Sequence, residues 1–135
     1  MKKIVAFISC FALACAFLFG CAPKTKVLKE TDEFIVITPS EKFVGKTLVE
    51  CMDGLKTSGE LDFSIKNGMI SSINGIDNPS DYSYCWMVYT DDADNSNVSW
   101  GQIEYKDKVY AMATLGAESL VIAEGCIYIW VYIKF

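Results

Sequence analysis

Apolar and polar residues alternate in several segments of the chain, a period of two that is typical of β-strands with one buried face. Leu61-Asp62-Phe63-Ser64-Ile65 alternates in this way and ends at Asn67-Gly68, a dipeptide that favours a hairpin turn. Residues 69–73 follow and end at a second such dipeptide, Asn74-Gly75. Runs rich in β-branched and aromatic residues predict further strands at 34–38, 82–90, 108–112 and 126–135.

One segment has a helical pattern instead. Thr47 and Glu50 fit a capping box, in which each side chain bonds the backbone N–H of the other residue. Leu48, Met52 and Leu55 then fall on one helical face. One helix among several antiparallel strands predicts an α+β domain, a small antiparallel sheet with one short helix packed on one face.

The first 20 residues match a secretory signal peptide. Lys2 and Lys3 supply the positive charge, and residues 4–20 are apolar or small apart from Ser9. An uncleaved transmembrane anchor is the alternative, although the apolar run is slightly shorter than the roughly 20 residues of a typical span.

The end of this segment resembles the lipobox of bacterial lipoproteins. In Leu18-Phe19-Gly20-Cys21 an aliphatic residue and a small residue precede the cysteine that would carry the lipid. The competing site at Cys15 would leave an apolar stretch exposed after cleavage. The sequence therefore predicts a signal peptide at 1–20, a lipidated Cys21 with a polar tether to residue 33, and one domain at 34–135. The domain would stand on the outer face of the bacterial cytoplasmic membrane.

Composition narrows the function. The chain has 12 Lys, 17 acidic residues, no Arg and no His. Without Lys2 and Lys3 the mature chain keeps 10 Lys against 17 acids, a formal charge of −7. An acidic surface without Arg repels phosphate backbones, which argues against nucleic acid as a partner. Without His the commonest near-neutral base is missing. No catalytic constellation is recognised, so we expect neither an enzyme nor a cofactor.

Two other patterns bear on metals and disulfides. Cys51, Cys85 and Cys126 are far apart and have no metal-binding spacing, so either two of them pair outside the cytoplasm or they are buried free thiols. Residues 91–97 are acidic, but Asn97 stands where an EF-hand needs glycine. We therefore expect a polar loop there and no metal site.

The two longest predicted strands carry aromatic residues at alternate positions. These are Tyr82, Tyr84 and Trp86 in the first strand, and Tyr128, Trp130 and Tyr132 in the last. If the strands are neighbours, their rings form an aromatic platform that suits a flat or apolar ligand. The alternative is that one row packs into the core, beneath the helix or a second layer of sheet.

Four motifs within residues 34–135 resemble, in the same order, those of the transcobalamin-like C-terminal domain, a module found in many bacterial surface proteins. They are the helix entry at 44–48, the hairpin at 68–76, the strand at 86–89 and the closing strand at 124–132. The resemblance implies a β-rich α+β module. In vitamin carriers this module covers one face of cobalamin while a separate helical domain holds the other. No counterpart of the helical domain is recognised here, and Cys126 replaces the usual acid after Gly125.

These patterns predict a non-catalytic, membrane-anchored module that binds a small ligand or a cell-surface partner. The alternative is a structural or protein-interaction domain without a small-molecule ligand. Cobalamin or another corrinoid is a candidate ligand through the resemblance alone. The candidate ligand-binding residues are aromatic: Trp86, Tyr89, Tyr128, Trp130 and Tyr132.

Overall fold

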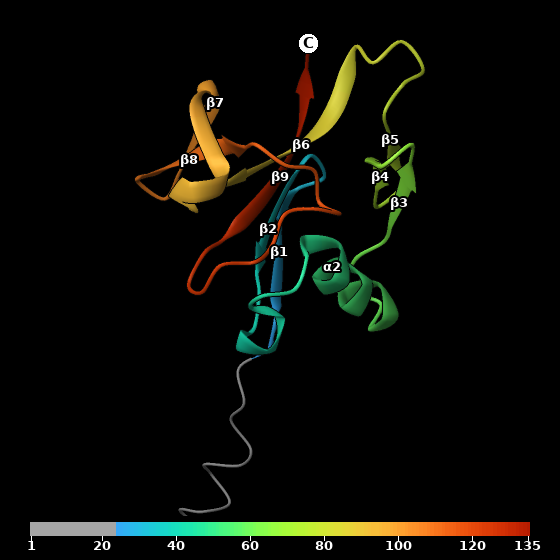
Figure 1. Ribbon diagram of the computed structural model, residues 1–135. Helices are drawn as coiled ribbons and strands as arrows, with labels where there is room; N and C mark the ends of the chain where they lie inside the picture. Colours follow the sequence, from blue (N-terminus) through green and yellow to red (C-terminus); the bar gives the residue numbers. More distant parts are fainter. Residues whose placement is uncertain (1–23) are drawn as a thin grey trace, which may run out of the picture.

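The computed structural model describes residues 24–135, which form two antiparallel sheets, one α-helix and two short 3-10 helices (Figure 1). The larger sheet has the order β1-β2-β9-β6-β8-β7 and the smaller one β3-β4-β5. The elements are β1 (Lys26–Thr31), β2 (Phe34–Thr38), η1 (Glu41–Phe43), α2 (Leu48–Thr57), β3 (Phe63–Lys66), β4 (Met69–Ile73), β5 (Ile76–Asp77), β6 (Tyr84–Thr90), η2 (Ala93–Asn95), β7 (Ser96–Tyr105), β8 (Lys108–Ala113) and β9 (Tyr128–Lys134). The predicted signal peptide and Cys21 lie outside the described residues.

The predicted α+β class is wrong, because the described chain is largely β. Strands make up 48% and helices 14%, with nine strands in two sheets beside one α-helix. The two Asn-Gly dipeptides do end strands of the smaller sheet, with positive φ at Asn67 and Asn74. What was not predicted is that these hairpin strands form a sheet of their own, separate from the larger one. Within residues 24–135, α2 and the 3-10 helices are all too short or too polar to cross a bilayer.

The predicted tether contains a strand. β1 pairs with β2 in an antiparallel ladder that joins Lys26 to Thr38 and Lys29 to Ile35. β1 lies at the sheet edge, and only Val27 of its six residues is even half-buried. Backbone hydrogen bonds hold β1 in the sheet, but almost none of its side chains is buried. The sequence of β1 therefore has no apolar period from which a strand could be predicted. Lysines on such an edge also discourage pairing with another chain.

The predicted polar loop at 91–97 is only partly a loop, because the long edge strand β7 begins at Ser96. Its pairing with β8 is interrupted between Asn97 and Gln102, which leaves a four-residue bulge at 98–101. Gly101 has φ +152°, a conformation open mainly to glycine, and a Cβ there would lie 3.2 Å from Met112 Cε. The side chains of Val98, Ser99 and Trp100 in this bulge are exposed to solvent.

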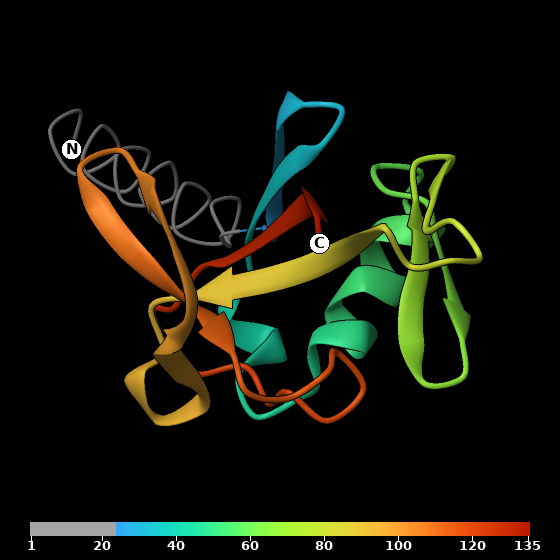
Figure 2. The same cartoon turned by 90° about the horizontal axis from the view of Figure 1, so that it is seen from above.

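Both faces of the larger sheet are buried, because alternate residues of β9 enter two different clusters. Tyr128 and Trp130 pack with Met52 of α2 and with residues of the smaller sheet. Ile129 points the other way and packs with Tyr110 of β8. Figures 1 and 2 show the same arrangement, with α2 and β3–β5 on one side of β6 and β9 and the β7–β8 hairpin on the other.

The predicted capping box of α2 is confirmed. The backbone N–H of Thr47 donates to Glu50 Oε2 at 2.8 Å, and that of Glu50 donates to Thr47 Oγ1 at 3.3 Å. Two further N–H groups of the first turn, those of Leu48 and Val49, donate to the carbonyls of Leu120 and Ala117. The segment after β8 is thereby fixed against the start of the helix.

Replacing Thr47 by alanine is expected to lower the free energy of unfolding by about 0.5–2 kcal/mol, because it removes the acceptor for the Glu50 N–H. Urea unfolding followed by circular dichroism measures this change. Thr57→Ala, at the exposed end of the same helix, is the matched control and should leave the midpoint unchanged. Equal midpoints for both variants would mean that Thr47 adds nothing as a cap.

Candidate functional site

The aromatic rows of β6 and β9 lie side by side, which meets the condition set for an aromatic face. The two strands pair over seven residues, with Trp86 opposite Tyr132 and Val88 opposite Trp130. The Tyr132 ring stacks on Tyr84 with centroids 5.4 Å apart and lies 5.2 Å from the Trp86 ring. The smaller sheet covers this row, since Trp86 Nε1–H and Tyr132 Oη–H donate to backbone carbonyls of β5, each at 2.8 Å.

Of the two alternatives for the aromatic rows, an exposed platform or a row packed into the core, the structure has the second. Trp86 and Trp130 are each 3% exposed, Tyr89 4% and Tyr128 0%, and only Tyr132 among the five candidates is half-buried. Tyr89 lies on the opposite face of the sheet, in the cluster with Ile129. Tyr128 Oη accepts the N–H of Ala123 at 2.9 Å, which ties the preceding loop to the core. The sequence could not show this, because burial of the row depends on where the second sheet packs.

A cleft opens where β8 leaves β6. β6 pairs with β8 at only two positions, Tyr89 with Met112 and Thr90 with Ala111, although it pairs with β9 along its whole length. Beyond this point the chain crosses toward the smaller sheet, where a Cβ on Gly116 would lie 3.8 Å from the carbonyl oxygen of Gly68. Between the free part of β6 and this crossing segment lies a cavity of about 200 Å³.

We name this cavity the tryptophan cleft, because all three tryptophans of the chain line it. Its inner wall includes the buried Trp86, Val88 and Trp130. Its full lining is Gly68, Met69, Ile70, Trp86, Met87, Val88, Trp100, Met112, Ala113, Thr114, Leu115, Gly116, Ala117 and Trp130. No lining side chain is charged, and Thr114 carries the only hydroxyl. The arrangement suits contact with an uncharged, largely apolar group and offers no general acid or base.

The rim of the tryptophan cleft is apolar and open to solvent. Trp100 is 58% exposed, Met69 46% and Leu115 43%. Trp100 lies in the bulge of β7. Asn97 Oδ1 stabilises this bulge, because it accepts hydrogen bonds from the backbone N–H of Ser99 at 2.9 Å and from the Ser99 hydroxyl at 2.8 Å. Single exposed apolar side chains are ordinary on protein surfaces, but three from separate strands and loops around one cavity are typical of a binding site.

One polar atom of the cleft residues stands out. Trp130 Nε1 is the one buried side-chain nitrogen or oxygen within residues 24–135 that has no hydrogen-bond partner. Leaving a buried donor unpaired costs about 1–3 kcal/mol. The neighbouring Trp86 has no such deficit, because its Nε1–H donates to Ile76.

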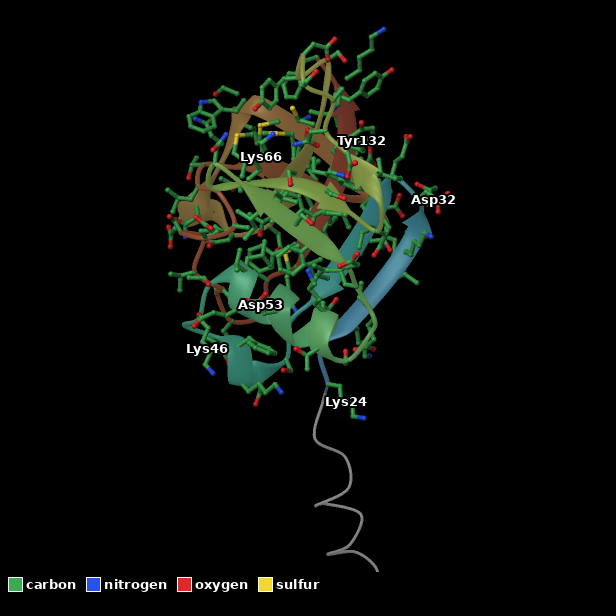
Figure 3. The ribbon with its side chains drawn as sticks, turned by 90° about the vertical axis from the view of Figure 1, so that its right-hand side faces the viewer. Lys24, Asp32, Lys46, Asp53, Lys66 and Tyr132 are labelled. Atoms are coloured by element: carbon green, nitrogen blue, oxygen red, sulfur yellow. The ribbon has the colours of Figure 1, made fainter. Side chains whose placement is uncertain are left out.

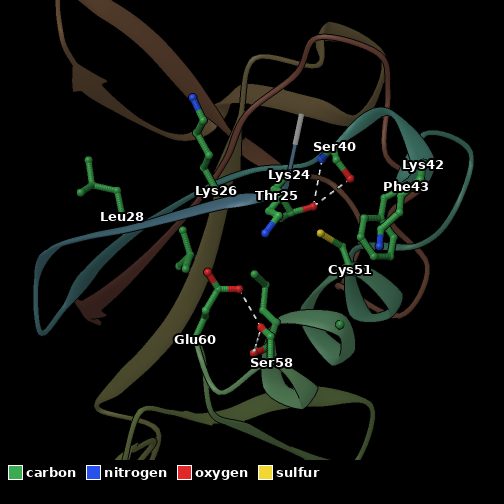
Figure 4. Close-up of a pocket in the computed structure, with 13 residues that line it drawn as sticks. Lys24, Thr25, Lys26, Leu28, Ser40, Lys42, Phe43, Cys51, Ser58 and Glu60 are labelled. Atoms are coloured by element: carbon green, nitrogen blue, oxygen red, sulfur yellow. Dashed lines mark hydrogen bonds between the residues drawn. The ribbon is translucent and has the colours of Figure 1, made fainter. Parts of the chain in front are cut away.

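A larger hollow of about 1110 Å³ lies between β1 and α2 (Figure 4). Its wall oxygens already bond one another, Thr25 Oγ1 to Ser40 Oγ at 3.1 Å and Ser58 Oγ to Glu60 at 2.6 Å. Burial raises the pKa of the Cys51 thiol on this wall to about 11, so the thiol is protonated near neutral pH and is a poor nucleophile. The lining also includes three lysines, Lys24, Lys26 and Lys42, so the charged part of this hollow is mainly basic.

The acidic segment after β6 is structural. Asp91 accepts the N–H of Ile127 at 2.8 Å and binds Lys108 Nζ at 2.7 Å. Burial alone would raise the pKa of Asp91, but these two hydrogen bonds outweigh it and lower the pKa. Asp92 caps η2 through Asp94 N–H. In the described part of the chain, no three His, Cys, Asp or Glu side chains gather into a group that could hold a metal.

The cysteines at 51, 85 and 126 are unpaired, so of the two sequence-based alternatives the structure has free thiols. Cys51 and Cys85 are buried and Cys126 is half-buried. Burial is the main cause that raises the pKa of both Cys85 and Cys126. These thiols pack as small apolar groups.

The structure thus brings Trp86 and Trp130 to one cleft, leaves Tyr132 beside it on the same face, and places Tyr89 and Tyr128 in core positions. Among the aromatic residues of the cleft, Trp100 is the one that the sequence pattern does not predict as a site residue. The signal that could have found it is a large aromatic residue in an otherwise polar segment, followed directly by Gly101.

Comparison with known proteins adds no relative. A scan of protein-family models, a search of curated proteins and a search of solved structures each find no match to this chain. The resemblance to the transcobalamin-like C-terminal domain, and the corrinoid ligand that it implies, therefore stay predictions.

Proposed function

We propose that the chain is a non-catalytic binding module that is held outside the cytoplasm by a lipid on Cys21 and takes an apolar, ring-sized group into the tryptophan cleft. The observation that carries this proposal is the meeting of three tryptophans around a cavity with an exposed apolar rim. Indole rings offer a large contact area at low entropic cost, and a preformed cavity needs little rearrangement to accept a guest.

The size of the cleft limits the guest. A cavity of about 200 Å³ is slightly larger than the roughly 150 Å³ cavity that binds benzene in an engineered core. One aromatic ring with a small substituent fits such a space, whereas a whole corrinoid does not. The rim would contact the remainder of any larger ligand.

The position of the cleft is compatible with a membrane anchor near residue 21. Figure 3 shows Lys66 and Tyr132 in the half of the molecule away from Lys24, the first described residue. Lys66 ends the strand just before Gly68 and Met69, which belong to the cleft. A chain anchored upstream of Lys24 would therefore hold the cleft on the side away from its attachment point.

Replacing Trp100 by alanine is expected to weaken binding of a single-ring probe by about tenfold or more, since it removes one wall of the cleft. Because Trp100 is 58% exposed, its loss should change the stability of the protein little. The probe is α-methylstyrene, and ligand-observed NMR on the full chain in phospholipid nanodiscs measures its binding, with empty nanodiscs as the blank.

Val98→Ala is the matched control, because Val98 is 60% exposed in the same bulge but does not line the cleft. It should bind the probe as the wild type does. Absence of binding to the wild type, or equal binding by the Trp100→Ala variant, would refute the proposed site. If the wild type binds the probe and the Trp100→Ala variant does not, native mass spectrometry of protein purified from its own membranes shows whether a natural ligand is retained. The same measurement on the Trp100→Ala variant shows whether that ligand is lost.

A further inference from the structure

We infer that the end of the domain next to Cys21 docks on the membrane, where the hollow between β1 and α2 receives the headgroup of an anionic phospholipid. The docking rests on the lipid at Cys21 in the proposed function and is independent of the tryptophan cleft. It adds a partner and an orientation to that function, since the domain then lies on the headgroups with its acidic part turned away from them.

The chain between the anchor and the sheet is short. β1 begins at Lys26, and the lining of the hollow includes Lys24. Cys21 precedes Lys24 by three residues, which span at most about 11 Å when fully extended. The headgroup layer on each side of a bilayer is about 5–8 Å deep. A lipid on Cys21 would therefore hold Lys24 within or just above this layer.

The β1–β2 hairpin gathers lysines at this end and acids at the other. Lys26 pairs with Thr38, so the start of β1 lies beside the segment that leads into η1 and Lys42. The acidic turn at 32–33 lies at the opposite end of the hairpin. Figure 4 shows Lys26 on the β1 side of the hollow and Lys42 beside Phe43 on the other side. Basic groups thus stand on both sides of the opening.

A second lysine lies close to Lys42. Lys42 Nζ is 5.0 Å and Lys46 Nζ 5.8 Å from the centre of the Phe43 ring. The ring packs on α2, since a Cβ on Gly54 would lie 3.1 Å from Phe43 Cζ. Val44, the next residue, is 40% exposed. Ammonium groups around a partly exposed ring and an exposed valine suit the boundary between headgroups and acyl chains.

Charge is distributed unevenly between this end and the rest of the domain. The segments that border the hollow, residues 24–28 and 40–60, carry five lysines against four acids. The rest of the mature chain carries five lysines against 13 acids. Lys56 pairs with Asp62, whereas the other four lysines of these segments have no carboxylate oxygen within 4.0 Å in the described part of the chain. An anionic surface therefore repels most of the domain but not this end.

The hollow suits a lipid headgroup better than a free phosphate ion. Its volume is about 1110 Å³, and its lysines alternate along β1 with Val27 and Leu28, the latter 48% exposed. Leu55 of α2 adds a further apolar group to the lining. A phosphate ion would contact only the lysines. A phospholipid also offers its glycerol and the first part of its acyl chains, which match the apolar side chains.

The test measures how close each end of the domain lies to the headgroups. The lipidated protein, labelled with 15N, is held in nanodiscs of phosphatidylcholine alone or mixed with phosphatidylglycerol, both with the same fraction of a nitroxide-headgroup lipid. Relaxation of the Leu28 and Phe43 backbone N–H groups should be enhanced about threefold or more in the anionic discs, since each lysine near an anionic surface favours docking by about fivefold. Tyr132, which Figure 3 shows far from Lys24, should change little. Added salt should abolish the difference between the discs.

Two triple variants with the same change in net charge test whether the position of the lysines matters. The first replaces the three lysines of the hollow by glutamine, as Lys24→Gln, Lys26→Gln and Lys42→Gln. The control replaces three exposed lysines elsewhere, as Lys66→Gln, Lys106→Gln and Lys134→Gln. The first variant should reduce the enhancement in anionic discs to the level of neutral discs, and the control should keep it.

Equal enhancement in the two kinds of disc, or equal loss in both triple variants, would overturn the docking. Glycerol phosphate that shifts the Leu28 and Phe43 resonances in neutral discs, without enhancement in anionic discs, would show that the hollow binds a soluble anion and would overturn the docking as well. Intact mass spectrometry of the same sample reports the lipid. Failure of docking with the lipid present leaves the proposed anchor standing, whereas protein without a lipid on Cys21 would refute both.

Discussion

Replacing Trp86 by alanine should lower the free energy of unfolding by about 3–5 kcal/mol, the usual cost of removing a fully buried tryptophan. Trp86 is 3% exposed and joins the two sheets. Its indole N–H donates to Ile76 of β5 at 2.8 Å, while its backbone N–H donates to Asn78 Oδ1 at 3.1 Å. The substitution opens a cavity beside Tyr132 and leaves the Ile76 carbonyl without this donor.

Trp86→Phe separates the two contributions in the same experiment. It keeps most of the packing and loses the indole N–H, so we expect a smaller cost of about 1–3 kcal/mol from the unpaired carbonyl and the reduced volume. Urea unfolding curves give both values. A Trp86→Ala protein with wild-type stability would show that the smaller sheet is not held by this residue, and the burial of the aromatic row would need another cause.

The sequence is most informative where one face of an element is buried. Leu48, Met52 and Leu55 give α2 its apolar face, and all three are buried as their spacing predicts. The alternation in β9 also sorts its two faces correctly, since Trp130 and Ile129 enter different clusters. In these elements local periodicity and tertiary burial agree, so the pattern is visible without a structure.

Elements whose side chains remain in solvent were missed. β1 and β7 are the two edge strands of the larger sheet, and most of their side chains are exposed or half-buried. β1 is held by backbone pairing with β2, and β7 by backbone pairing with β8. Such pairing depends on the position of the neighbouring strand and leaves no pattern in the sequence of the edge strand itself. The error in fold class follows from these strands and from the unforeseen second sheet.

The sequence predicts two of the aromatic residues of the candidate site. It does so through an expected aromatic row, whereas the structure brings these residues together in a cleft. The sequence pattern favours Trp86 and Trp130 as members of an exposed row, but they line the cleft from the buried side. The cleft depends on β8 leaving β6 after two residue pairs and on the bulge that presents Trp100. Both are properties of strand register, which the composition of a single strand does not determine.

Replacing Cys21 by alanine should move the protein from the membrane fraction to the soluble fraction, or leave its leader uncut. The expectation rests on the Leu18-Phe19-Gly20-Cys21 pattern, in which the cysteine thiol would carry the lipid. Cell fractionation with immunoblotting, together with incorporation of a labelled fatty acid, measures both effects. Cys15→Ala is the control at the competing site and should mature and fractionate as the wild type does.

The same variant distinguishes the anchor from the binding site. The cleft lining contains no residue before Gly68, and Figure 3 places the neighbouring Lys66 far from Lys24. Where the Cys21→Ala protein is released with its leader removed, it should therefore bind α-methylstyrene as tightly as the wild type in nanodiscs. A Cys21→Ala protein that is processed normally and stays on the membrane would show that lipidation at this cysteine does not anchor the chain. Release accompanied by loss of probe binding would instead show that the cleft needs the anchored state.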